Sequence, residues 1–324
     1  METFWFVAIA TLWLGYLFLE GFDFGVGMLL RVLGRTESER GAMLTTIGPV
    51  WDGNEVWLIV AAGATFAAFP GWYASLFSAA YLLMLLILLG LIGRGVALEW
   101  RGKVDSDRWR ARWDAVNGVG SLVATLGVGL LLSWNILGIP LDASGNRVGS
   151  PSAVLRWDTA VGALMFTGFA LVHGAVFVSL KTDGVLRRRA HRFALGCLPW
   201  GLVPLLALVL VAQLREGFTW TWLPALAVPL AAAAAWWRLR AGAEGQAFAL
   251  LGLTLAAAAV TLFGALYPNV LPSTVDAANS LTVQGAASSP YTLKVMTWLA
   301  AFGLPAVLVY QGWTYWVFRK RVVT

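Results

Sequence analysis

The sequence of 324 residues is poor in the side chains that usually hold metals, because it contains one cysteine, Cys197, and two histidines, His173 and His191. A single cysteine excludes an intrachain disulfide and a cysteine-held metal cluster. Two histidines are too few for a haem or a binuclear metal centre held by this chain alone. We expect His173, within the apolar stretch "LVHGAVF", to be a hydrogen-bonded packing residue rather than a lone axial ligand. The sequence therefore predicts no metal-binding and no cofactor-binding residues in this chain.

Charged side chains are also scarce. They make up 12% of the residues, whereas hydrophobic residues make up 59%, with 18 tryptophans and a mean hydropathy of +0.73. A soluble domain needs a larger polar share, so the composition excludes that class. The formal net charge of +6 does not by itself indicate nucleic acid, because basic residues in a membrane protein usually record its orientation. The composition indicates an all-α integral membrane protein.

Long apolar runs set the expected architecture, since a membrane-spanning helix needs about 20 mostly apolar residues. The stretches that meet this requirement are 5–30, 50–69, 74–98, 115–139, 157–180, 192–214, 220–238, 246–268 and 292–318. They predict one polytopic membrane domain over 1–324 with about nine transmembrane helices. We expect a first four-helix bundle in 1–139, a second in 157–268 and a peripheral last helix in 292–318. The first stretch follows Met1 and Glu2 rather than a basic run, so we expect it to be retained and not cleaved as a signal.

The basic residues are distributed unevenly between the loops. Most of the 23 lysines and arginines follow the first, third, fifth, seventh and ninth predicted helices. The alternate loops hold only Arg147, Arg156 and Arg215. Because loops rich in Lys and Arg stay on the cytoplasmic side, this pattern predicts an outside N-terminus and a cytoplasmic C-terminus.

Two local patterns lie in and after the first predicted helix. Gly21, Gly25 and Gly27 have the small-residue spacing that favours close packing of membrane helices, and this is a better interpretation than a nucleotide-binding loop. Thr36 is followed three residues later by Glu39, which is the spacing of a capping box. We therefore expect a close helix contact at the glycines and a short interfacial helix after Thr36.

Two acids lie in the middle of the first apolar stretch, in "LEGFDFG". Counted back from Arg31 at about 1.5 Å per residue, Asp23 lies about 12 Å and Glu20 about 16 Å inside the membrane. Asp52 and Glu55 repeat the same i, i+3 spacing in "VWDGNEVWL", near the same surface. A charged side chain at mid-depth costs about 2.5–3.5 kcal/mol, so such residues face protein or water and mark functional sites. We expect these carboxyl groups to exchange protons.

Each acid also has a structural interpretation, because it can pair with Arg94 or with a base of a partner and hold helices together. We favour that structural role for Glu55 and Asp114, which lie nearer the membrane interface. For the two acids of the first helix and for Asp52 we favour a functional role.

These motifs together resemble a known family. The segment "EGFDFGVGMLLRVLGRTESERGAMLTTIGPVWDGNEVWLIVAAGATFAAFP" resembles the N-terminal signature of cytochrome bd oxidase subunit II, the haem-free partner of a haem-bearing subunit I. Further similarity lies in "RWRARWD", "WNILGIPLD", "HGAVFVSLKTDG", "LYPNVLPS" and "YTLKVMTW". The resemblance runs nearly from end to end, although the Ala-rich and Gly-rich stretches at 220–238 and 246–268 do not align by eye.

The resemblance implies a quinol:oxygen oxidoreductase in the bacterial cell membrane, which reduces oxygen to water and takes protons from the cytoplasmic side. It implies haem b and haem d in the complex, both held by subunit I, with quinol as the substrate, and it allows a structural quinone or lipid in this chain. The implied partners are subunit I in a pseudo-symmetric heterodimer, small single-helix accessory subunits and membrane lipids, with no nucleic acid.

The resemblance also assigns roles to individual residues. The position that matches Asp52 is an acid on a proton route near the subunit interface, and Asp23 and Glu20 fall in the acid-bearing stretch of the first helix. The depths given above suit a proton pathway from Asp52 to Asp23 and Glu20. Trp57 matches an aromatic residue near the mouth of a hydrophobic oxygen channel, and its alternative interpretation is an interfacial belt tryptophan. No residue of this chain is implied to be catalytic.

A proton-coupled secondary transporter is the alternative function, in which broken helices and intramembrane acids couple proton flow to a substrate. A transporter tends to show interrupted helices in corresponding halves, whereas here the acids gather in the first two predicted helices. The helix-breaking Pro229 and Pro305 have no acidic neighbours. The oxidase function is therefore favoured.

We expect the chain to purify with a larger partner whose visible spectrum shows b-type and d-type haems. The measurement is an absorption spectrum of the complex after affinity purification from native membranes. A colourless chain that purifies alone and binds a small substrate would instead indicate the transporter.

Overall fold

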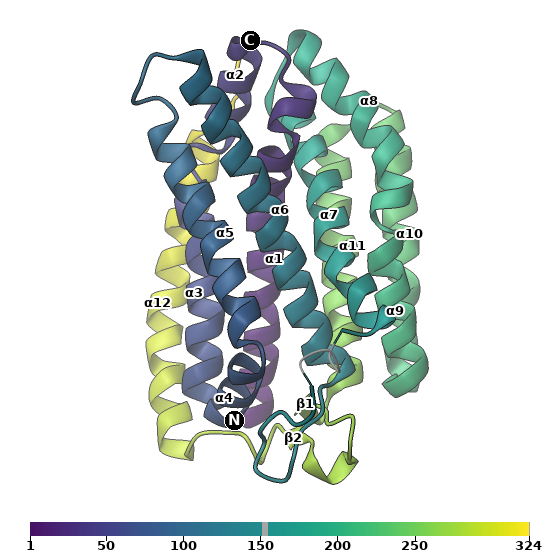
Figure 1. Cartoon of the computed structure of the whole chain (residues 1–324). Coiled ribbons are helices and arrows are strands. Elements are labelled where there is room, and N and C mark those ends of the chain that lie inside the picture. Colours follow the sequence, from purple (N-terminus) through teal and green to yellow (C-terminus); the bar gives the residue numbers. More distant parts are fainter. Residues whose placement is uncertain (151–154, 324) are drawn as a thin grey trace.

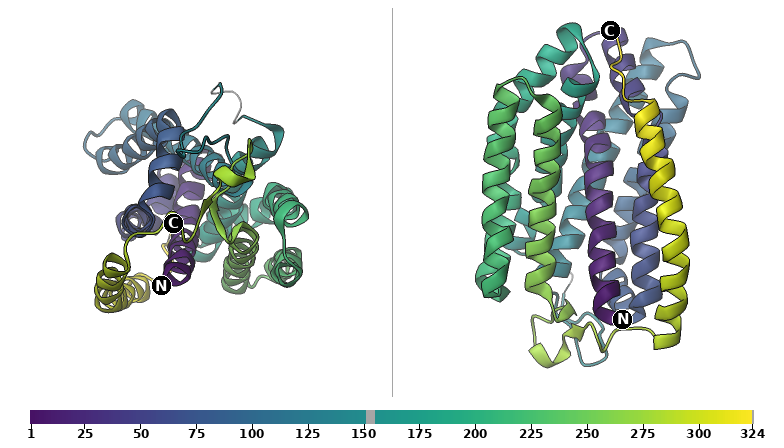
Figure 2. Two further views of the ribbon diagram at one scale, coloured as in Figure 1. Left: turned by 90° about the horizontal axis from the view of Figure 1, so that it is seen from below. Right: turned by 180° about the vertical axis from the view of Figure 1, so that it is seen from behind.

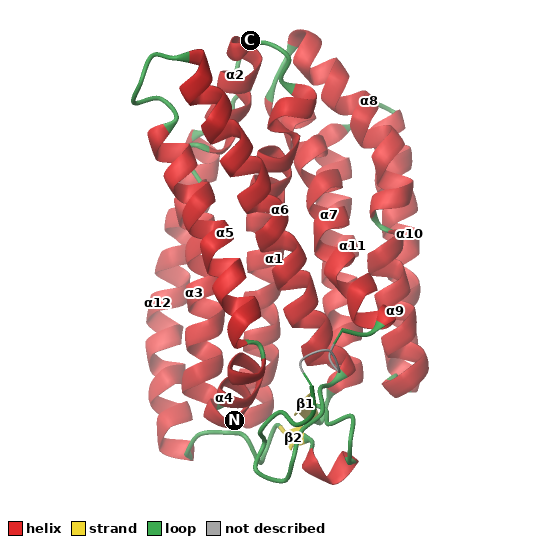
Figure 3. Cartoon of the chain, viewed as in Figure 1, coloured by secondary structure: helices red, strands yellow, loops and turns green. Residues whose placement is uncertain are grey.

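The computed structural model describes residues 1–150 and 155–323, and most of them are helical (Figure 3). The helices are α1 (Glu2–Leu33), α2 (Glu37–Ile47), α3 (Trp51–Ala68), α4 (Pro70–Ala79), α5 (Tyr81–Trp100), α6 (Asp107–Leu137), α7 (Trp157–Lys181), α8 (Gly184–Gly201), α9 (Val203–Glu216), α10 (Trp222–Arg240), α11 (Glu244–Leu266) and α12 (Pro290–Val317). Short 3-10 turns lie at Thr219–Thr221 and Ala277–Asn279, and β1 (Asn269–Leu271) pairs antiparallel with β2 (Leu281–Thr282). The predicted all-α membrane class is confirmed.

Eight helical segments among the described residues are long and apolar enough to cross a membrane. They are α1, α5, α6, α7, the consecutive α8 and α9, α10 with its preceding turn, α11 and α12. The stretch predicted at 50–69 forms α3, which is not among the eight because its first turn carries the polar residues Asp52, Asn54 and Glu55. The count of nine crossings and the inside and outside assignment therefore stay predictions.

Two of the predicted helices are interrupted. The stretch 192–214 divides at Leu202 between α8 and α9, and Pro204 lies in the first turn of α9. Proline has no backbone N–H to donate and suits the first turn of a helix, which explains a new helix start at this position. The stretch 74–98 divides at Ala80 between α4 and α5, and nothing in the local sequence explains that break.

The long helices run in nearly the same direction, and α1 lies between two groups of them (Figure 1, Figure 2). Helices α3, α5 and α12 lie on one side of α1, and α8 to α11 lie on the other (Figure 1). Helix α1 also packs directly against α6 and α7. The two termini lie at opposite ends of the molecule (Figure 1). The assignment of one bundle to 1–139 and a second to 157–268 stays a prediction.

Helices α1 and α7 approach closely at a pair of glycines. A Cβ atom added at Gly25 would overlap the carbonyl oxygen of Ala170 and would lie 2.7 Å from the Cα of Gly174. A Cβ atom added at Gly174 would lie 2.5 Å from the Cα of Gly25. The two backbones can meet only because neither residue has a side chain, which confirms the close helix contact predicted for Gly25.

Ion pairs link the helices at the end of the molecule that holds α2 and the C-terminus, which we call the basic end (Figure 1). Asp114 of α6 is buried and lies 2.5 Å from Nε of Arg101 and 3.3 Å from Nε of Arg40. This geometry agrees with the structural role favoured for Asp114. Ion pairs between these side chains therefore hold the helices together at the basic end.

The capping box predicted at Thr36 is present. The backbone N–H of Glu39 donates to Oγ1 of Thr36 at 3.2 Å, and the backbone N–H of Thr36 donates to Oε2 of Glu39 at 3.3 Å. Arg189 of α8 lies 2.8 Å from the same carboxylate. The Arg189 guanidinium, together with these backbone donors, holds the pKa of Glu39 below its ordinary value.

We expect Gly25→Ala to destabilise the protein by about 1–3 kcal/mol, because the added methyl group separates α1 from α7. The measurement is the thermal denaturation midpoint of the purified protein. Gly196→Ala is the matched control, since a Cβ atom at this helical glycine would meet no atom within 4 Å. Equal midpoints for the two variants would contradict the close contact.

Candidate functional site

A fully buried ion pair joins α1 to α5. Nη1 of Arg94 lies 2.5 Å from Oε1 of Glu20, and neither side chain is exposed to solvent. The Arg94 guanidinium also lies 4.8 Å from the ring centroid of Phe24 and 5.9 Å from that of Trp51. Removing one member of a buried ion pair leaves an uncompensated charge, which is strongly destabilising. Each member of this pair therefore depends on the other.

Several polar atoms around this pair have no hydrogen-bond partner within the described residues. Besides the ion pair between Nη1 of Arg94 and Oε1 of Glu20, Oε2 of Glu20 and Nε and Nη2 of Arg94 have no hydrogen-bond partner in the described part of the chain. The hydroxyl of Tyr16, one helical turn from Glu20, and Oδ1 of Asp23 are also without hydrogen bonds. Buried polar atoms are normally satisfied by protein groups or by ordered water. The acid cluster, which we define as Glu20, Asp23 and Arg94, therefore has unused hydrogen-bonding capacity inside an apolar protein.

Asp23 is held by Asn54 of α3. Nδ2 of Asn54 donates to Oδ2 of Asp23 at 2.7 Å. Oδ1 of Asn54 accepts hydrogen bonds from the hydroxyl of Tyr315 at 2.7 Å and from Nε2 of Gln311 at 3.2 Å. Both of these donors belong to α12, which is otherwise largely exposed. The last helix therefore reaches the acid cluster through Asn54.

Trp57 of α3 completes this set of contacts. Its Nε1 donates to Oε1 of Gln311 at 2.8 Å. Its ring lies against α1, where a Cβ atom added at Gly15 would come within 2.5 Å of the ring carbons. Trp57 is thus half-buried between three helices, while the oxygen-channel role predicted for it stays a prediction.

The two acids of α3 lie in different surroundings. Glu55 is half-buried, with Oε1 3.9 Å from Nη1 of Arg94, which agrees with the structural pairing favoured for it. Asp52 is exposed and makes no hydrogen bond or ion pair within the described part of the chain. Helix α3 starts at the basic end (Figure 1), and Asp52 precedes Asn54 by two residues, so it lies roughly 3 Å of helix rise nearer that end. The structure gathers Glu20, Asp23 and Glu55 around Arg94, whereas Asp52 lies on the surface one helical turn before Glu55.

The sequence patterns did not predict Asn54, Gln311 and Tyr315 as residues of the site. Amide and hydroxyl side chains carry no charge, so a single one within an apolar helix gives little indication in the sequence that it belongs to a site. Gln311 and Tyr315 are four residues apart in "YQGWTYW", which places both on one face of a helix. That spacing is the signal that could have identified α12 as a helix with a polar inner face.

The surroundings of His173 do not suit a haem. His173 is fully buried, and its ring centroid lies 4.3 Å from that of Phe248 and 4.9 Å from those of Phe18 and Phe169. These rings fill the space around the imidazole that a porphyrin would need, so His173 is packed as expected. The hydrogen bond expected for it is not found, because neither ring nitrogen has a hydrogen-bond partner among the described residues. His191 lies in α8, away from the acid cluster. Among the described residues, no group of three or more His, Cys, Asp and Glu side chains could hold a metal ion.

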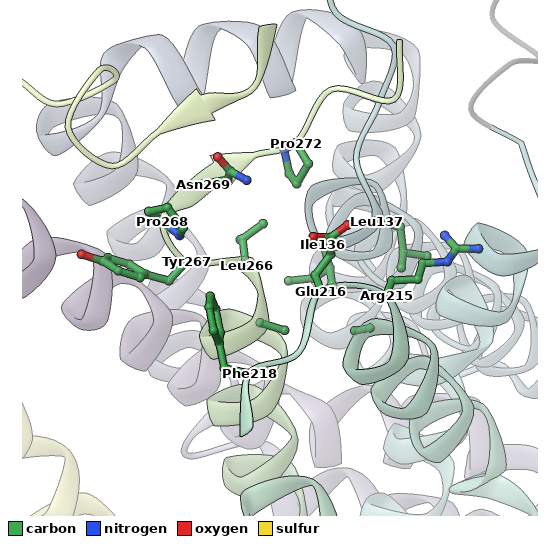
Figure 4. Close-up of a pocket in the computed structure, with 12 residues that line it drawn as sticks. Ile136, Leu137, Arg215, Glu216, Phe218, Leu266, Tyr267, Pro268, Asn269 and Pro272 are labelled. Carbon is green, nitrogen blue, oxygen red and sulfur yellow. The ribbon is translucent and has the colours of Figure 1, made fainter. Parts of the chain in front are cut away.

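Two cavities lie at the end opposite the basic end, away from the acid cluster. A pocket of about 130 Å³ is formed by the ends of α6, α9 and α11, and Arg215, Glu216 and Asn269 provide its polar groups (Figure 4). An apolar groove of about 650 Å³ runs beside it between α1 and α11, and the two share Phe218, Tyr267 and Pro268. No residue of the acid cluster lines either cavity.

We expect Arg94→Gln to destabilise the protein by about 3–5 kcal/mol, because it leaves the buried Glu20 without its cation. The measurement is the thermal denaturation midpoint, with Arg31→Gln as a control at an exposed arginine of α1. The double variant Glu20→Gln/Arg94→Gln should recover part of the loss, since it removes both charges. A double variant less stable than Arg94→Gln would show that Glu20 does not depend on Arg94.

Comparison with known proteins agrees with the resemblance seen in the sequence. The cytochrome bd ubiquinol oxidase subunit 2 of Bacillus subtilis (strain 168) is 40% identical over 326 residues, covering 98% of this chain and 96% of the relative. The cytochrome bd-I ubiquinol oxidase subunit 2 of Escherichia coli (strain K12) is 32% identical over 357 residues, covering 98% and 94%. Both alignments thus extend over nearly the whole of each protein.

The fold and the family are shared as well. A chain in the structure of the bd oxidase from Geobacillus thermodenitrificans matches with a TM-score of 0.79 and 17% sequence identity, covering 98% of this chain and 99% of that chain, which shows a common fold. The sequence profile of the family described as cytochrome bd terminal oxidase subunit II matches residues 1–318. Because this match covers nearly the entire chain, the protein belongs to the cytochrome bd terminal oxidase subunit II family.

Proposed function

We propose that the buried acids carry protons from the basic end toward the oxygen-reducing site of a bd-type quinol oxidase, of which this chain is subunit II. Reduction of oxygen to water consumes protons as well as electrons, and an apolar interior conducts protons only along ionisable groups and water. The proposal is carried by the full burial of Glu20 and Asp23 with oxygens that lack hydrogen-bond partners in the described residues. Family membership sets aside the transporter alternative.

The proposed order of transfer is Asp52, then Asp23, then Glu20. Asp52 is exposed and lies nearest the basic end, which the positive-inside rule assigns to the cytoplasm. Asp23 keeps one buried oxygen that can accept and release a proton. Glu20 lies deeper, and Arg94 compensates the charge that Glu20 carries when it is deprotonated. The acids therefore supply exchangeable sites at increasing depth.

The exposed face of α3 is the proposed contact with subunit I in a pseudo-symmetric heterodimer. Val56, Ile59 and Val60 are exposed on this helix, and Asp52 is exposed in its first turn. A carboxylate is costly against lipid, whereas a protein partner can place polar groups or water beside it. Coverage of this face by subunit I would continue the proton route from this chain into its partner.

The cofactors of the complex are assigned to the partner. Family membership implies haems and quinol in the complex. Because the surroundings of His173 do not suit a haem, haem b, haem d and the residues that bind quinol are proposed to belong to subunit I. The groove between α1 and α11, with Arg215 and Glu216 beside it, is the proposed location of a structural quinone or lipid.

Three further features are carried over from the family as proposals. The complex is assigned to the bacterial cytoplasmic membrane, in agreement with a chain that has several helices able to span a bilayer. Small single-helix accessory subunits and lipids are proposed to join it. An oxygen channel is proposed to open near Trp57, where apolar residues of α3 are exposed.

We expect Asp52→Asn to lower quinol-driven oxygen consumption at least about 10-fold while leaving the haem content unchanged, because an amide cannot relay a proton. Turnover and haem content are measured on the purified complex. Glu99→Gln is the control, since it neutralises an exposed acid of α5 near the basic end. Full activity of Asp52→Asn would remove Asp52 from the proton route.

A further inference from the structure

A directional chain of hydrogen bonds connects Trp57 to Asp23. Trp57 Nε1 donates to Oε1 of Gln311 at 2.8 Å, and Nε2 of Gln311 donates to Oδ1 of Asn54 at 3.2 Å. Nδ2 of Asn54 then donates to Oδ2 of Asp23 at 2.7 Å. This series of hydrogen bonds passes from α3 to α12, back to α3 and finally to α1. In each bond the donor is on the Trp57 side and the acceptor is on the Asp23 side.

The donor-to-acceptor direction of these hydrogen bonds is determined at Trp57. An indole N–H can only donate, so the carbonyl oxygen of Gln311 must face Trp57 and its NH₂ group must face Asn54. That NH₂ group can only donate, so the carbonyl oxygen of Asn54 must face it. The hydroxyl of Tyr315, 2.7 Å from the same oxygen, could donate or accept and does not by itself decide the orientation. The orientation of Gln311 is therefore fixed by the indole. The orientation of Asn54 is fixed by Gln311 together with the backbone carbonyl oxygen of Leu19, which lies 3.4 Å from Nδ2 of Asn54 and can only accept.

The orientation of Asn54 distinguishes the two oxygens of Asp23. Oδ2 accepts the Asn54 N–H, so a proton on that oxygen would oppose the donor. Oδ1 is buried and has no hydrogen-bond partner in the described residues. If the amide of Asn54 were reversed, its carbonyl oxygen would face Oδ2 and would favour a proton there instead. The remaining charged neighbours, Glu20, Glu55 and Arg94, do not depend on this amide.

We propose that Trp57 is a positioning residue that selects Oδ1 of Asp23 as the proton-exchanging oxygen, acting through Gln311 and Asn54. The inference rests on the proposed function, because it concerns how Asp23 presents its proton site within the route. It gives Trp57 a role different from the mouth of an oxygen channel, and it gives α12 a part in proton transfer. A proton binds Oδ1 and leaves from Oδ1, while Oδ2 remains an acceptor throughout.

The test is a double-mutant cycle of Trp57→Phe and Gln311→Leu in the purified complex, measured as turnover at saturating oxygen and as the KM for oxygen. Phenylalanine keeps an aromatic ring against Gly15 but removes the indole N–H. Each single variant should lower turnover about 3-fold to 10-fold, because the amides can then reverse. The double variant should be no slower than Gln311→Leu alone, since the indole acts only through Gln311. The KM for oxygen should stay unchanged.

The matched control is Trp298→Phe, at an exposed tryptophan of α12, which should retain full turnover. Haem content is measured for every variant to exclude loss of assembly. If Trp57→Phe does not assemble, Gln311→Glu replaces it in the test. A glutamate carboxylate offers only acceptors to Asn54, so its turnover must fall at least as far as that of Gln311→Leu.

Several results would overturn the inference. Additive losses in the double variant would show that Trp57 acts independently of Gln311, and full turnover of either single variant would show that the amide orientation does not matter. A raised KM for oxygen with unchanged saturating turnover would return Trp57 to the oxygen channel. Asp23→Asn separates this inference from the proposed function: full turnover there contradicts the proposed function, whereas a loss there with full turnover of Trp57→Phe contradicts only the inference.

Discussion

The buried ion pair between the guanidinium of Arg94 and the carboxylate of Glu20 is the constraint around which the centre of this protein is arranged. Neither side chain is exposed, and their atoms approach to 2.5 Å. Their burial requires α1 and α5 to stay together, since separation would leave a charge in hydrocarbon. The aromatic rings of Phe24 and Trp51 beside the guanidinium contribute a further favourable contact. The surrounding helices thus enclose a charged site that an apolar protein keeps only where it has a use.

Uncharged polar groups connect this site to the rest of the molecule. Asn54 touches Asp23 on one side and two donors of α12 on the other. Helix α12 buries little of its surface, and these hydrogen bonds, together with those that Trp5 donates to Leu293 and Thr297, hold it against α1 and α3. In a low-dielectric interior such bonds are stronger than they are in water, and their direction is transmitted from one amide to the next. A peripheral helix can therefore influence a buried acid without contacting it.

Local sequence rules predicted several features well, and their failures have physical causes. The capping box at Thr36 and the packing glycine Gly25 depend on short-range sterics and hydrogen bonding, which neighbouring residues define. The breaks at Leu202 and Ala80 were missed because hydropathy is continuous across both. Asn54, Gln311 and Tyr315 were missed because each makes its hydrogen bonds with partners far away in the chain.

The sequence by itself determined the all-α membrane class and the family, because long apolar runs report the number of residues that a bilayer-spanning helix needs and the family motifs extend over nearly the whole chain. Only the tertiary structure decided which groups meet. It brought Arg94, 74 positions beyond Glu20 in the chain, into contact with that acid, and it joined Trp57 to Gln311 across 254 positions. It also buried Glu20 and Asp23 while leaving Asp52 exposed. Such pairings follow from how helix faces rotate and pack against one another, which the periodicity of a single helix does not specify.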